Sequence, residues 1–195
     1  SIRFPASCCG LVGMKPTYGL VSRYGAMPLS FSLDHIGPLT RTVTDCALLT
    51  QIIAGPDEND PTSLKHQKLN YLEKIESGIN GIKIGVSRTK FIDQVDGEVL
   101  REMKKTLEVF KSLGAKVVEI DLPTSFNISN EMANIITAVE SSSAHKKWLK
   151  QRPGDYGRQT RERLLSGSLI SATDYLEALK LRKVILKEFL KYVFE

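Results

Sequence analysis

The 195-residue chain has little of what builds disulfide frameworks, metal sites or membrane spans. Its three cysteines, two of them adjacent (Cys8 and Cys9), form no disulfide framework and no Cys-x-x-Cys pair, which favours a reducing compartment, the cytoplasm. Its three histidines are scattered and offer no cluster on which a metal site could be built. No apolar run reaches the roughly 20 residues that a membrane span needs. We therefore expect no metal and no membrane partner.

The composition is that of a globular protein, with 42% hydrophobic and 25% charged residues in a chain long enough to bury a core. The net charge of +5 is uneven, because most of the excess Lys and Arg follows residue 145. With Trp148 and Tyr156 interleaved, this region could form a nucleic-acid surface. Acidic residues scattered among the basic ones favour the alternative, a set of solvated helix faces.

Glycine and proline recur every few residues over the first sixty positions, too densely for a helix or a long strand. Apolar residues lie between them, which argues against a solvated linker and for backbone that lines a site. Three motifs occur here: Ser1-Ile2-Arg3-x-Pro5-Ala6, Gly10-Leu11-Val12-Gly13-x-Lys15-Pro16-Thr17 and Ser32-Leu33-Asp34-His35-Ile36-Gly37-Pro38-x-Thr40-Arg41-Thr42-Val43-x-Asp45.

These three motifs, in this order, make the chain resemble the amidase signature family of serine hydrolases. The resemblance implies an α/β fold with a mixed β-sheet surrounded by helices, no cofactor, and Ser1 as the catalytic nucleophile. It also implies that the family's catalytic Lys and bridging Ser lie upstream of Ser1. The resemblance covers the whole chain but only the middle of a family member, since further strands and helices follow in the family. We therefore expect residues 1–195 to be the central part of a single amidase signature domain, incomplete at both ends, and the absence of an initiator Met agrees with this.

The activity that the resemblance implies is hydrolysis of a carboxamide, a small-molecule substrate, through an acyl-enzyme. The isolated fragment is expected to be inactive, and its uncovered apolar faces and strand edges to favour association, with a homodimer left open. The alternative is the A subunit of a tRNA-dependent amidotransferase, which releases ammonia from glutamine and meets charged tRNA through a complex. The segment 132–136 lacks the tyrosines of those subunits, and residues 172–178 are more similar to general amidases. Both features favour a stand-alone amidase.

Three basic residues are candidates for the site. In the amidotransferases an Arg in the region of Arg182 holds the glutamine carboxylate, so Arg182 is a candidate substrate-binding residue, with a surface Arg as the alternative. Arg3 either holds a substrate carboxylate or, the preferred interpretation, fixes the turn after Ser1. Among candidates for a substitute general base, Lys15 is the nearest to Ser1 in sequence. The family pattern, however, makes Lys-Pro-Thr part of the scaffold.

Other chemistries find less support in the sequence. A processed N-terminal nucleophile could use the α-amino group of Ser1 as its base, but the motifs match a family whose Ser is internal. His35 lies in a structural loop of the family pattern, and His66 and His145 have no partner pattern for a Ser-His-Asp triad. The acidic turn over residues 56–63 lacks the central Gly and terminal Glu of a calcium-binding EF-hand.

Sequence periodicity and turn residues also predict the elements. We expect helices over residues 1–9 (or a turn), 42–54, 70–76, 97–113, 129–150, 157–166 and 171–194. We expect strands over 11–14, 20–22, 82–87 and 116–122, and a loop over 30–41 packed inward through Leu33, Ile36 and Leu39. The order strand, helix, strand over residues 82–122 is that of a βαβ unit, so its two strands should be parallel.

Overall fold

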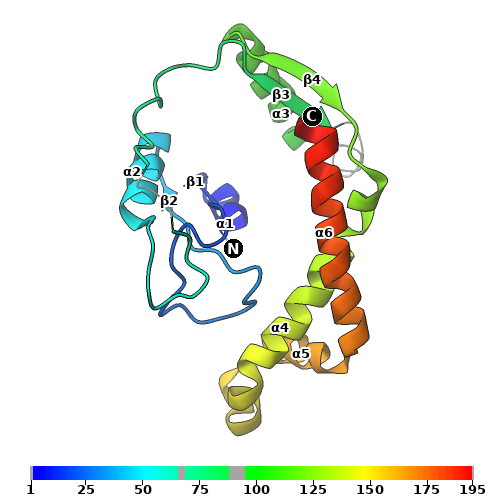
Figure 1. The fold of residues 1–195 in the computed structure, drawn as a ribbon. Coiled ribbons are helices and arrows are strands. Elements are labelled where there is room, and N and C mark those ends of the chain that lie inside the picture. Colours follow the sequence, from blue (N-terminus) through cyan, green and yellow to red (C-terminus); the bar gives the residue numbers. More distant parts are fainter. Residues whose placement is uncertain (1, 66–68, 88–94, 195) are drawn as a thin grey trace. The chain divides into compact units, whose positions relative to one another are not determined.

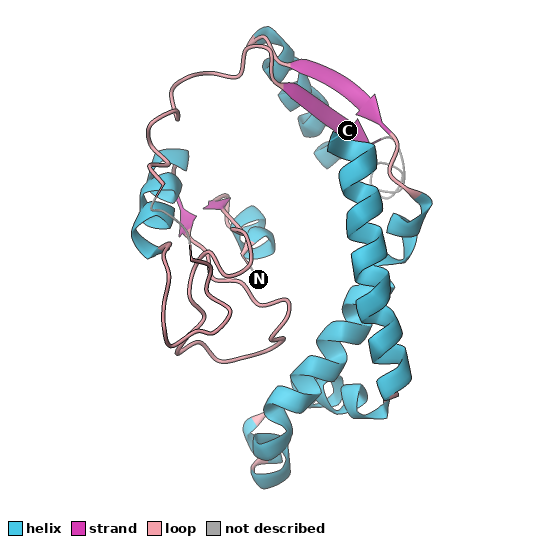
Figure 2. Cartoon of the chain, in the orientation of Figure 1, coloured by secondary structure: helices cyan, strands magenta, loops and turns pink. Residues whose placement is uncertain are grey.

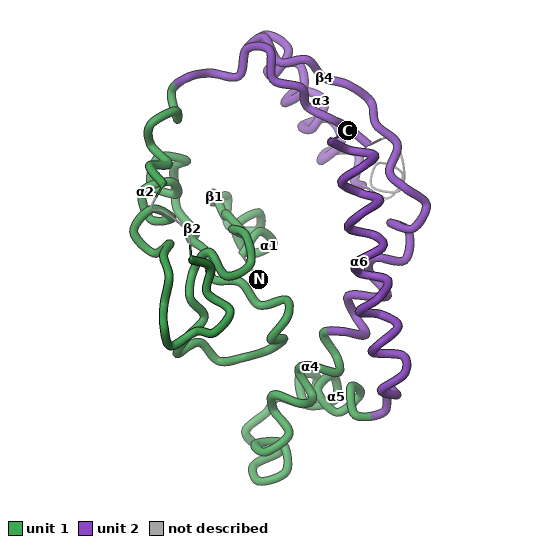
Figure 3. Tube along the Cα trace, in the orientation of Figure 1, with its two compact units in different colours: residues 1–76, 137–168 green, residues 77–136, 169–195 purple. Residues whose placement is uncertain are grey.

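The computed structural model of the chain describes residues 2–65, 69–87 and 95–194 and divides into two compact units (Figure 3). The first unit joins residues 1–76 to residues 137–168, and the second joins residues 77–136 to residues 169–195. Helix α4 (Ser129–Gln151) starts in the second unit and ends in the first. The boundary between the units therefore runs through a helix that the sequence pattern predicts as one element.

The start of the first unit is built from very short elements joined by turns (Figure 1). Helix α1 (Arg3–Cys8) is followed by strand β1 (Val12–Gly13), which pairs antiparallel with β2 (Leu39–Thr40). The helix after residue 1 and the strand near residue 12 are thus confirmed. The predicted strand over 20–22 is reduced to one bridge between Val21 and Ala54, because the chain turns at Gly19 and again at Gly25, both with positive φ.

Helix α2 (Val43–Ile53) starts where the sequence predicts it, because the Thr42 hydroxyl accepts a hydrogen bond from the Asp45 amide at 3.0 Å. The apolar spacing of this helix predicts a buried face through Val43, Cys46, Ala47, Leu49 or Thr50, and Ile53, and this prediction is partly wrong. Cys46 and Thr50 are buried, whereas Val43 is 62% exposed. A helix buries only the stripe that meets a neighbour, and here that stripe follows the four-residue spacing from Cys46 through Thr50. Of the two alternatives Leu49 and Thr50, Thr50 is the buried one, and Ile53 at the end of the predicted face is exposed.

Two other predictions for the first unit need correction. Residues 70–76 form consecutive turns and not a helix, with hydrogen bonds such as that from the Glu73 amide to the Asn70 carbonyl at 3.4 Å. Such a short segment cannot hold a helix without packing against a neighbour. The loop over 30–41 ends in strand β2, and Leu39 is exposed because its neighbour Thr40 takes the inward position of that strand.

The end of the first unit is helical. After α4, the short 3₁₀ turn η2 (Pro153–Asp155) reverses the chain, and α5 (Arg158–Ser166) and the 3₁₀ turn η3 (Gly167–Leu169) follow. The predicted break at residue 153 and the helix over 157–166 are confirmed. Figure 2 shows how few strand residues the described chain contains beside these helices.

The second unit contains the predicted βαβ unit. Strands β3 (Lys83–Ser87) and β4 (Lys116–Ile120) are parallel and in register, and α3 (Gly97–Ser112) connects them. Asp96 caps α3 by accepting from the Glu98 amide at 2.8 Å, and Gly114 ends it at φ 86°. The half-buried stripe of α3 uses Leu100 and not Val99. Most of the predicted loop over 88–96 lies outside the described residues.

The long helix α6 (Ala172–Phe194) completes the second unit and begins at a cap on Ser171, whose hydroxyl accepts from the Asp174 amide at 3.1 Å. It packs on the 3₁₀ turn η1 (Thr124–Ile128): the rings of Phe126 and Phe189 stack at 5.6 Å. Its fully buried residues are Ala178 and Ile185. Of the face that its apolar spacing predicts, Val184 and Leu186 are exposed, and the others are half-buried: Tyr175, Leu179, Phe189 and Val193. A helix buries only the stripe that meets its neighbours, and Ile185 lies on that stripe where Val184 and Leu186 do not.

The predicted α/β class is confirmed, since helices accompany one antiparallel and one parallel strand pair. Several large apolar side chains are exposed, including Phe4 at 77%, Ile52 at 62% and Phe194 at 75%. These are uncovered apolar positions of the kind that the sequence predicts to favour association. Among the helices that the structure describes, none combines the length and hydropathy of a membrane span.

Candidate active site

A cavity of about 950 Å³ lies in the first unit, beside the start of the chain. Ser1 itself lies outside the described residues, but the residue bonded to it, Ile2, lines this cavity and is 8% exposed. The rest of the lining comes from α1, from Lys15, from residues 23–36, from the turn over 59–61 and from Thr137 on α4. The Gly- and Pro-rich region is therefore the wall of a cavity, as the sequence predicts.

Two glycines allow the backbone to pack tightly around Ile2. A Cβ added to Gly37 would lie 2.2 Å from the Met14 carbonyl oxygen and 2.8 Å from Cδ1 of Ile2. A Cβ added to Gly13 would lie 2.6 Å from the Cβ of Ala6. No larger residue fits at either position, so the two glycines fix how β1 and the 30–41 segment approach α1 and the residue that follows Ser1.

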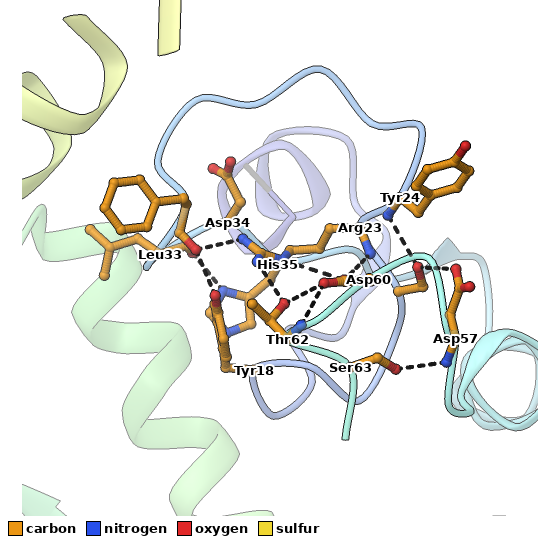
Figure 4. A network of polar contacts seen from close by, with 12 residues as sticks. Tyr18, Arg23, Tyr24, Leu33, Asp34, His35, Asp57, Asp60, Thr62 and Ser63 are labelled. Carbon is orange, nitrogen blue, oxygen red and sulfur yellow. Dashed lines mark hydrogen bonds and ion pairs between the residues drawn. The ribbon is translucent and has the colours of Figure 1, made fainter. Parts of the chain in front are cut away.

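Arg23 is the centre of a polar network at the cavity wall (Figure 4). Its backbone amide donates to an Asp60 carboxylate oxygen at 2.8 Å, and its guanidinium donates to the Thr62 hydroxyl and to the Phe31 carbonyl, each at 2.7 Å. The guanidinium also lies over the Tyr18 ring, 4.7 Å from its centroid. Every one of these contacts joins residues that are not sequence neighbours, so the network holds the 18–34 region against the turn over 57–63.

Two acidic side chains of that turn act as structural acceptors. Asp60, only 7% exposed, accepts from the amide and the hydroxyl of Thr62 at 2.9 and 2.6 Å. Asp57 accepts from the Ser22 hydroxyl at 2.6 Å. Among the described residues there is no group of three or more His, Cys, Asp or Glu side chains placed to hold a metal ion. The carboxylates of Asp57 and Asp60 stabilise the turn over residues 57–63.

The hydrogen bonds to Asp60 make part of the fold's stability dependent on pH. The Thr62 hydroxyl, followed by the Arg23 and Thr62 amides, lowers the pKa of Asp60 from 3.8 to about 2. The stabilisation is complete above pH 3.8 and is lost as the pH falls through about 2, because the unfolded chain binds the proton first. We expect the Asp60→Asn variant to melt at a lower temperature at pH 7 and to lose less of its melting temperature between about pH 4 and 2.

The matched control for this prediction is Asp121→Asn, at an exposed carboxylate in the second unit. Its melting curve should follow the wild type at every pH. Thermal unfolding followed by circular dichroism across that pH range is the measurement. A wild type and an Asp60→Asn variant with parallel pH profiles would contradict the assigned role of Asp60.

The two basic candidates near the start of the chain both line the cavity. The Lys15 ammonium donates to the Pro16 carbonyl at 2.9 Å, which fits the scaffold role that the family pattern assigns to it. Burial, and then the positive charge of Arg3, lowers the pKa of Lys15. Arg3 is exposed at the first position of α1, so both interpretations given for it remain predictions.

Arg182 is not among the residues that line the cavity. Arg182 is half-buried on α6 in the second unit, whereas the cavity belongs to the first unit. Its contact with substrate therefore stays a prediction. His35 lines the cavity, and its Nδ1 lies 2.6 Å from the Leu33 carbonyl oxygen, as a structural loop residue would. His66 lies outside the described residues.

Sequence reasoning missed the roles of two buried polar residues on α4, Glu140 and His145. Glu140 is 1% exposed and accepts from Ser30 and Ser32; His145 is 6% exposed and contacts the Pro28 carbonyl and the Tyr156 hydroxyl. One signal was present: Glu140 lies four residues after the apolar Ile136, on the same face of the predicted helix. An acid on an apolar face indicates a buried partner.

Comparison with known proteins gives the family. The whole chain, residues 1–195, matches the family described as Amidase. It is 41% identical to a glutamyl-tRNA(Gln) amidotransferase A-type subunit of Clostridium acetobutylicum, covering 100% of this chain and 46% of that protein. It is 40% identical to the amidase of Pseudomonas putida, covering 95% of this chain and 40% of that protein. A crystal structure of an amidase superposes with a TM-score of 0.81 at 34% identity, covering 100% of this chain and 41% of that chain.

The chain thus belongs to the amidase signature family, and the resemblance of its three motifs is confirmed. It spans less than half the length of the relatives that it matches. The match of its α/β fold to a solved amidase likewise covers a part of that chain.

Proposed function

We propose that this chain is the central part of an amidase that hydrolyses a carboxamide through an acyl-enzyme on Ser1. The observation that carries the proposal is the placement of the motif at the start of the chain: Ile2, the residue after the candidate nucleophile, is buried in the wall of a cavity of about 950 Å³. That volume is of the size that holds a small-molecule ligand. Family membership supplies the chemistry.

The reaction proceeds in two steps. The Ser1 hydroxyl oxygen forms a bond to the amide carbonyl carbon and passes its proton through the bridging Ser to the neutral Lys, both of which the family places upstream of this chain. The backbone N–H of Ser1 donates to the oxyanion. The C–N bond breaks as that proton passes to the leaving amine, and an ester to Ser1 remains. Water then hydrolyses the ester, releasing the acid and restoring the hydroxyl.

Described residues contribute the frame of this site. Gly13 and Gly37 fix the backbone around Ile2, and the Arg23–Asp60 network fixes another part of the cavity wall. The wall also carries the positive charges of Arg3 and Lys15. These groups position a substrate beside Ser1. The two reaction steps above use no metal or other cofactor.

A second candidate function is favoured by one observation. The relative in Clostridium acetobutylicum is named as an A-type subunit of an amidotransferase. In that function the same two steps would act on glutamine, and the ammonia would pass to charged tRNA in a complex with other subunits. Glutamine hydrolysis that depends on partner subunits would identify this function, and hydrolysis of simple carboxamides without partners would identify a stand-alone amidase.

The test compares the protein at the full length encoded by its gene with the 195-residue chain alone. We expect the full-length protein to release ammonia from carboxamides and, with hydroxylamine present, to form the hydroxamate, because hydroxylamine intercepts the acyl-enzyme. We expect the 195-residue chain to be inactive, since the loss of a general base alone costs roughly a hundred- to ten-thousand-fold. Amide hydrolysis by the purified 195-residue chain, or hydrolysis without hydroxamate by the full-length protein, would contradict the proposal.

A further inference from the structure

The segment 27–31 presents an apolar surface to the cavity. Met27, Leu29 and Phe31 line the cavity and are 72%, 46% and 57% exposed, whereas Ser30 between them is 1% exposed. The three exposed apolar side chains thus line the same cavity, while the Ser30 hydroxyl donates to Glu140 in the interior of the unit.

Two buried side chains of α4 hold the inner side of this segment. Glu140 accepts from the Ser30 hydroxyl at 2.5 Å, from the Ser32 amide at 3.0 Å and from the Ser32 hydroxyl at 2.7 Å. Nε2 of His145 lies 2.9 Å from the Pro28 carbonyl oxygen. A carbonyl oxygen only accepts, so Nε2 carries a proton, and in the neutral ring Nδ1 accepts from the Tyr156 hydroxyl at 2.9 Å.

These contacts fix the backbone of residues 27–31, a task that ladder hydrogen bonds perform in a β-strand. Residues 27–31 belong to no strand, and their further anchors include the Asp34 carboxylate, which accepts from the Leu29 and Ser30 amides at 2.8 and 2.9 Å, and two donors to the Phe31 carbonyl. Each of these anchors holds backbone or the inward side chain of Ser30. The three apolar side chains take no part in them and stay open to a ligand.

We propose that Glu140 and His145 are positioning residues that hold residues 27–31 as an apolar wall of the substrate site, and that this wall selects amides that carry an apolar group. This inference rests on the proposed function. A wall displaced by about 1 Å loses its fit to the substrate, and such misplacement from a distance can cost about a hundredfold in rate. Glu140 and His145 touch the wall and not the substrate, so they act on selectivity through Leu29, Phe31 and Met27.

The test uses the full-length protein and two substrates, phenylacetamide for an apolar amide and acetamide for a small one. The readout is the ratio of their kcat/KM values. We expect the wild type to prefer phenylacetamide, and Leu29→Ala to lower its kcat/KM about tenfold while acetamide changes less than about twofold, because an apolar pocket discriminates by about 10–200-fold per methylene-sized contact. Glu140→Gln should lower the same ratio, mainly through KM. Exposed Glu131, on the same helix, gives the matched control Glu131→Gln, with an unchanged ratio.

Hydrogen exchange separates positioning from general stability. Glu140→Gln should speed exchange of the Ser32 amide, which Glu140 binds, while amides of the second unit exchange as in the wild type. His145→Leu should speed exchange at Leu29 and Ser30, and His145→Gln, which keeps an N–H donor, should restore it. If Glu140→Gln does not fold, the two His145 variants carry the same comparison of exchange and ratio.

The outcomes are distinct. A wild type that hydrolyses neither amide contradicts the proposed function itself. A wild type that hydrolyses both amides without preferring phenylacetamide overturns the apolar wall. Variants that fold, exchange faster at the wall and keep the wild-type ratio overturn the positioning role of Glu140 and His145.

Discussion

We expect the Ser1→Ala variant of the full-length protein to hydrolyse carboxamides at least about a thousandfold more slowly than the wild type. Without the Ser1 hydroxyl oxygen no acyl-enzyme forms. Water would then have to attack the amide directly, without the proton path that activates Ser1. The buried residues at this end of the chain are Ile2 and Ala6, which the substitution leaves in place. The variant should therefore fold and melt like the wild type.

The measurement pairs steady-state kinetics with mass spectrometry of the peptide that contains Ser1. A slowly hydrolysed ester or amide should add the mass of its acyl group to that peptide in the wild type and not in Ser1→Ala. Ser112→Ala is the matched control, because the Ser112 hydroxyl is exposed and bonds locally, to the Val109 carbonyl at 2.8 Å. Full activity in Ser1→Ala would remove the nucleophile from the proposal.

One further mass decides between an internal and an N-terminal nucleophile. A native protein near 21.7 kDa whose first residue is Ser1 would favour the mechanism in which its α-amino group is the base. A native protein more than twice that mass would make Ser1 internal, as it is in the family. The acyl-group label on Ser1 is expected in both cases, so the two measurements answer separate questions.

Local signals were sufficient for most elements of the fold. The cap at Thr42, the glycine at 114 and the apolar spacing along residues 97–113 each act within one or two turns of chain, and the structure has the helices that they predict. The parallel pairing of β3 with β4 followed from the length of the connection between them. Such features depend on neighbours in sequence, and a sequence displays those directly.

The buried faces were predicted less well, because burial depends on which element arrives from elsewhere. Val43 and Ile53 fit an apolar helix stripe, yet α2 buries Cys46 and Thr50. The same holds for Leu186 on α6, which is exposed while Ile185 beside it is buried. Periodicity gives the spacing of a stripe and not its rotation around the helix axis when apolar residues occupy several positions.

The candidate site shows the same limit at longer range. The motif over residues 1–6 indicated the region of the cavity, since Ile2, Arg3 and Phe4 line it. Glu140 accepts hydrogen bonds from Ser30 and Ser32, which lie 110 and 108 residues before it in the chain. No spacing in the sequence predicts contacts over such a separation. The wall over 27–31 became visible only once the partners on α4 were known. The proposed wall therefore depends on how closely α4 is held within the first unit.

Gly167 sets how closely η3 approaches α4, so we expect Gly167→Ala to lower the stability of the protein by about 3 kcal/mol. A Cβ at this position would lie 1.9 Å from the Ala138 carbonyl oxygen and 2.9 Å from the Ser142 Cβ. Its φ of −63° is open to any residue, so the loss would come from the clash and not from backbone strain. The added Cβ would clash with Ala138 and Ser142, and Glu140 lies between these two residues on α4. The preference for phenylacetamide should therefore fall as well.

Gly154→Ala is the matched control, because a Cβ there meets nothing within 4 Å. Its free energy of unfolding should stay within about 0.5 kcal/mol of the wild type. Urea denaturation followed by circular dichroism measures both variants. A Gly167→Ala variant as stable as the control would mean that η3 can move away from α4 at little cost. The spacing between Glu140 and Ser30 would then be fixed by contacts between α4 and residues 27–34 alone.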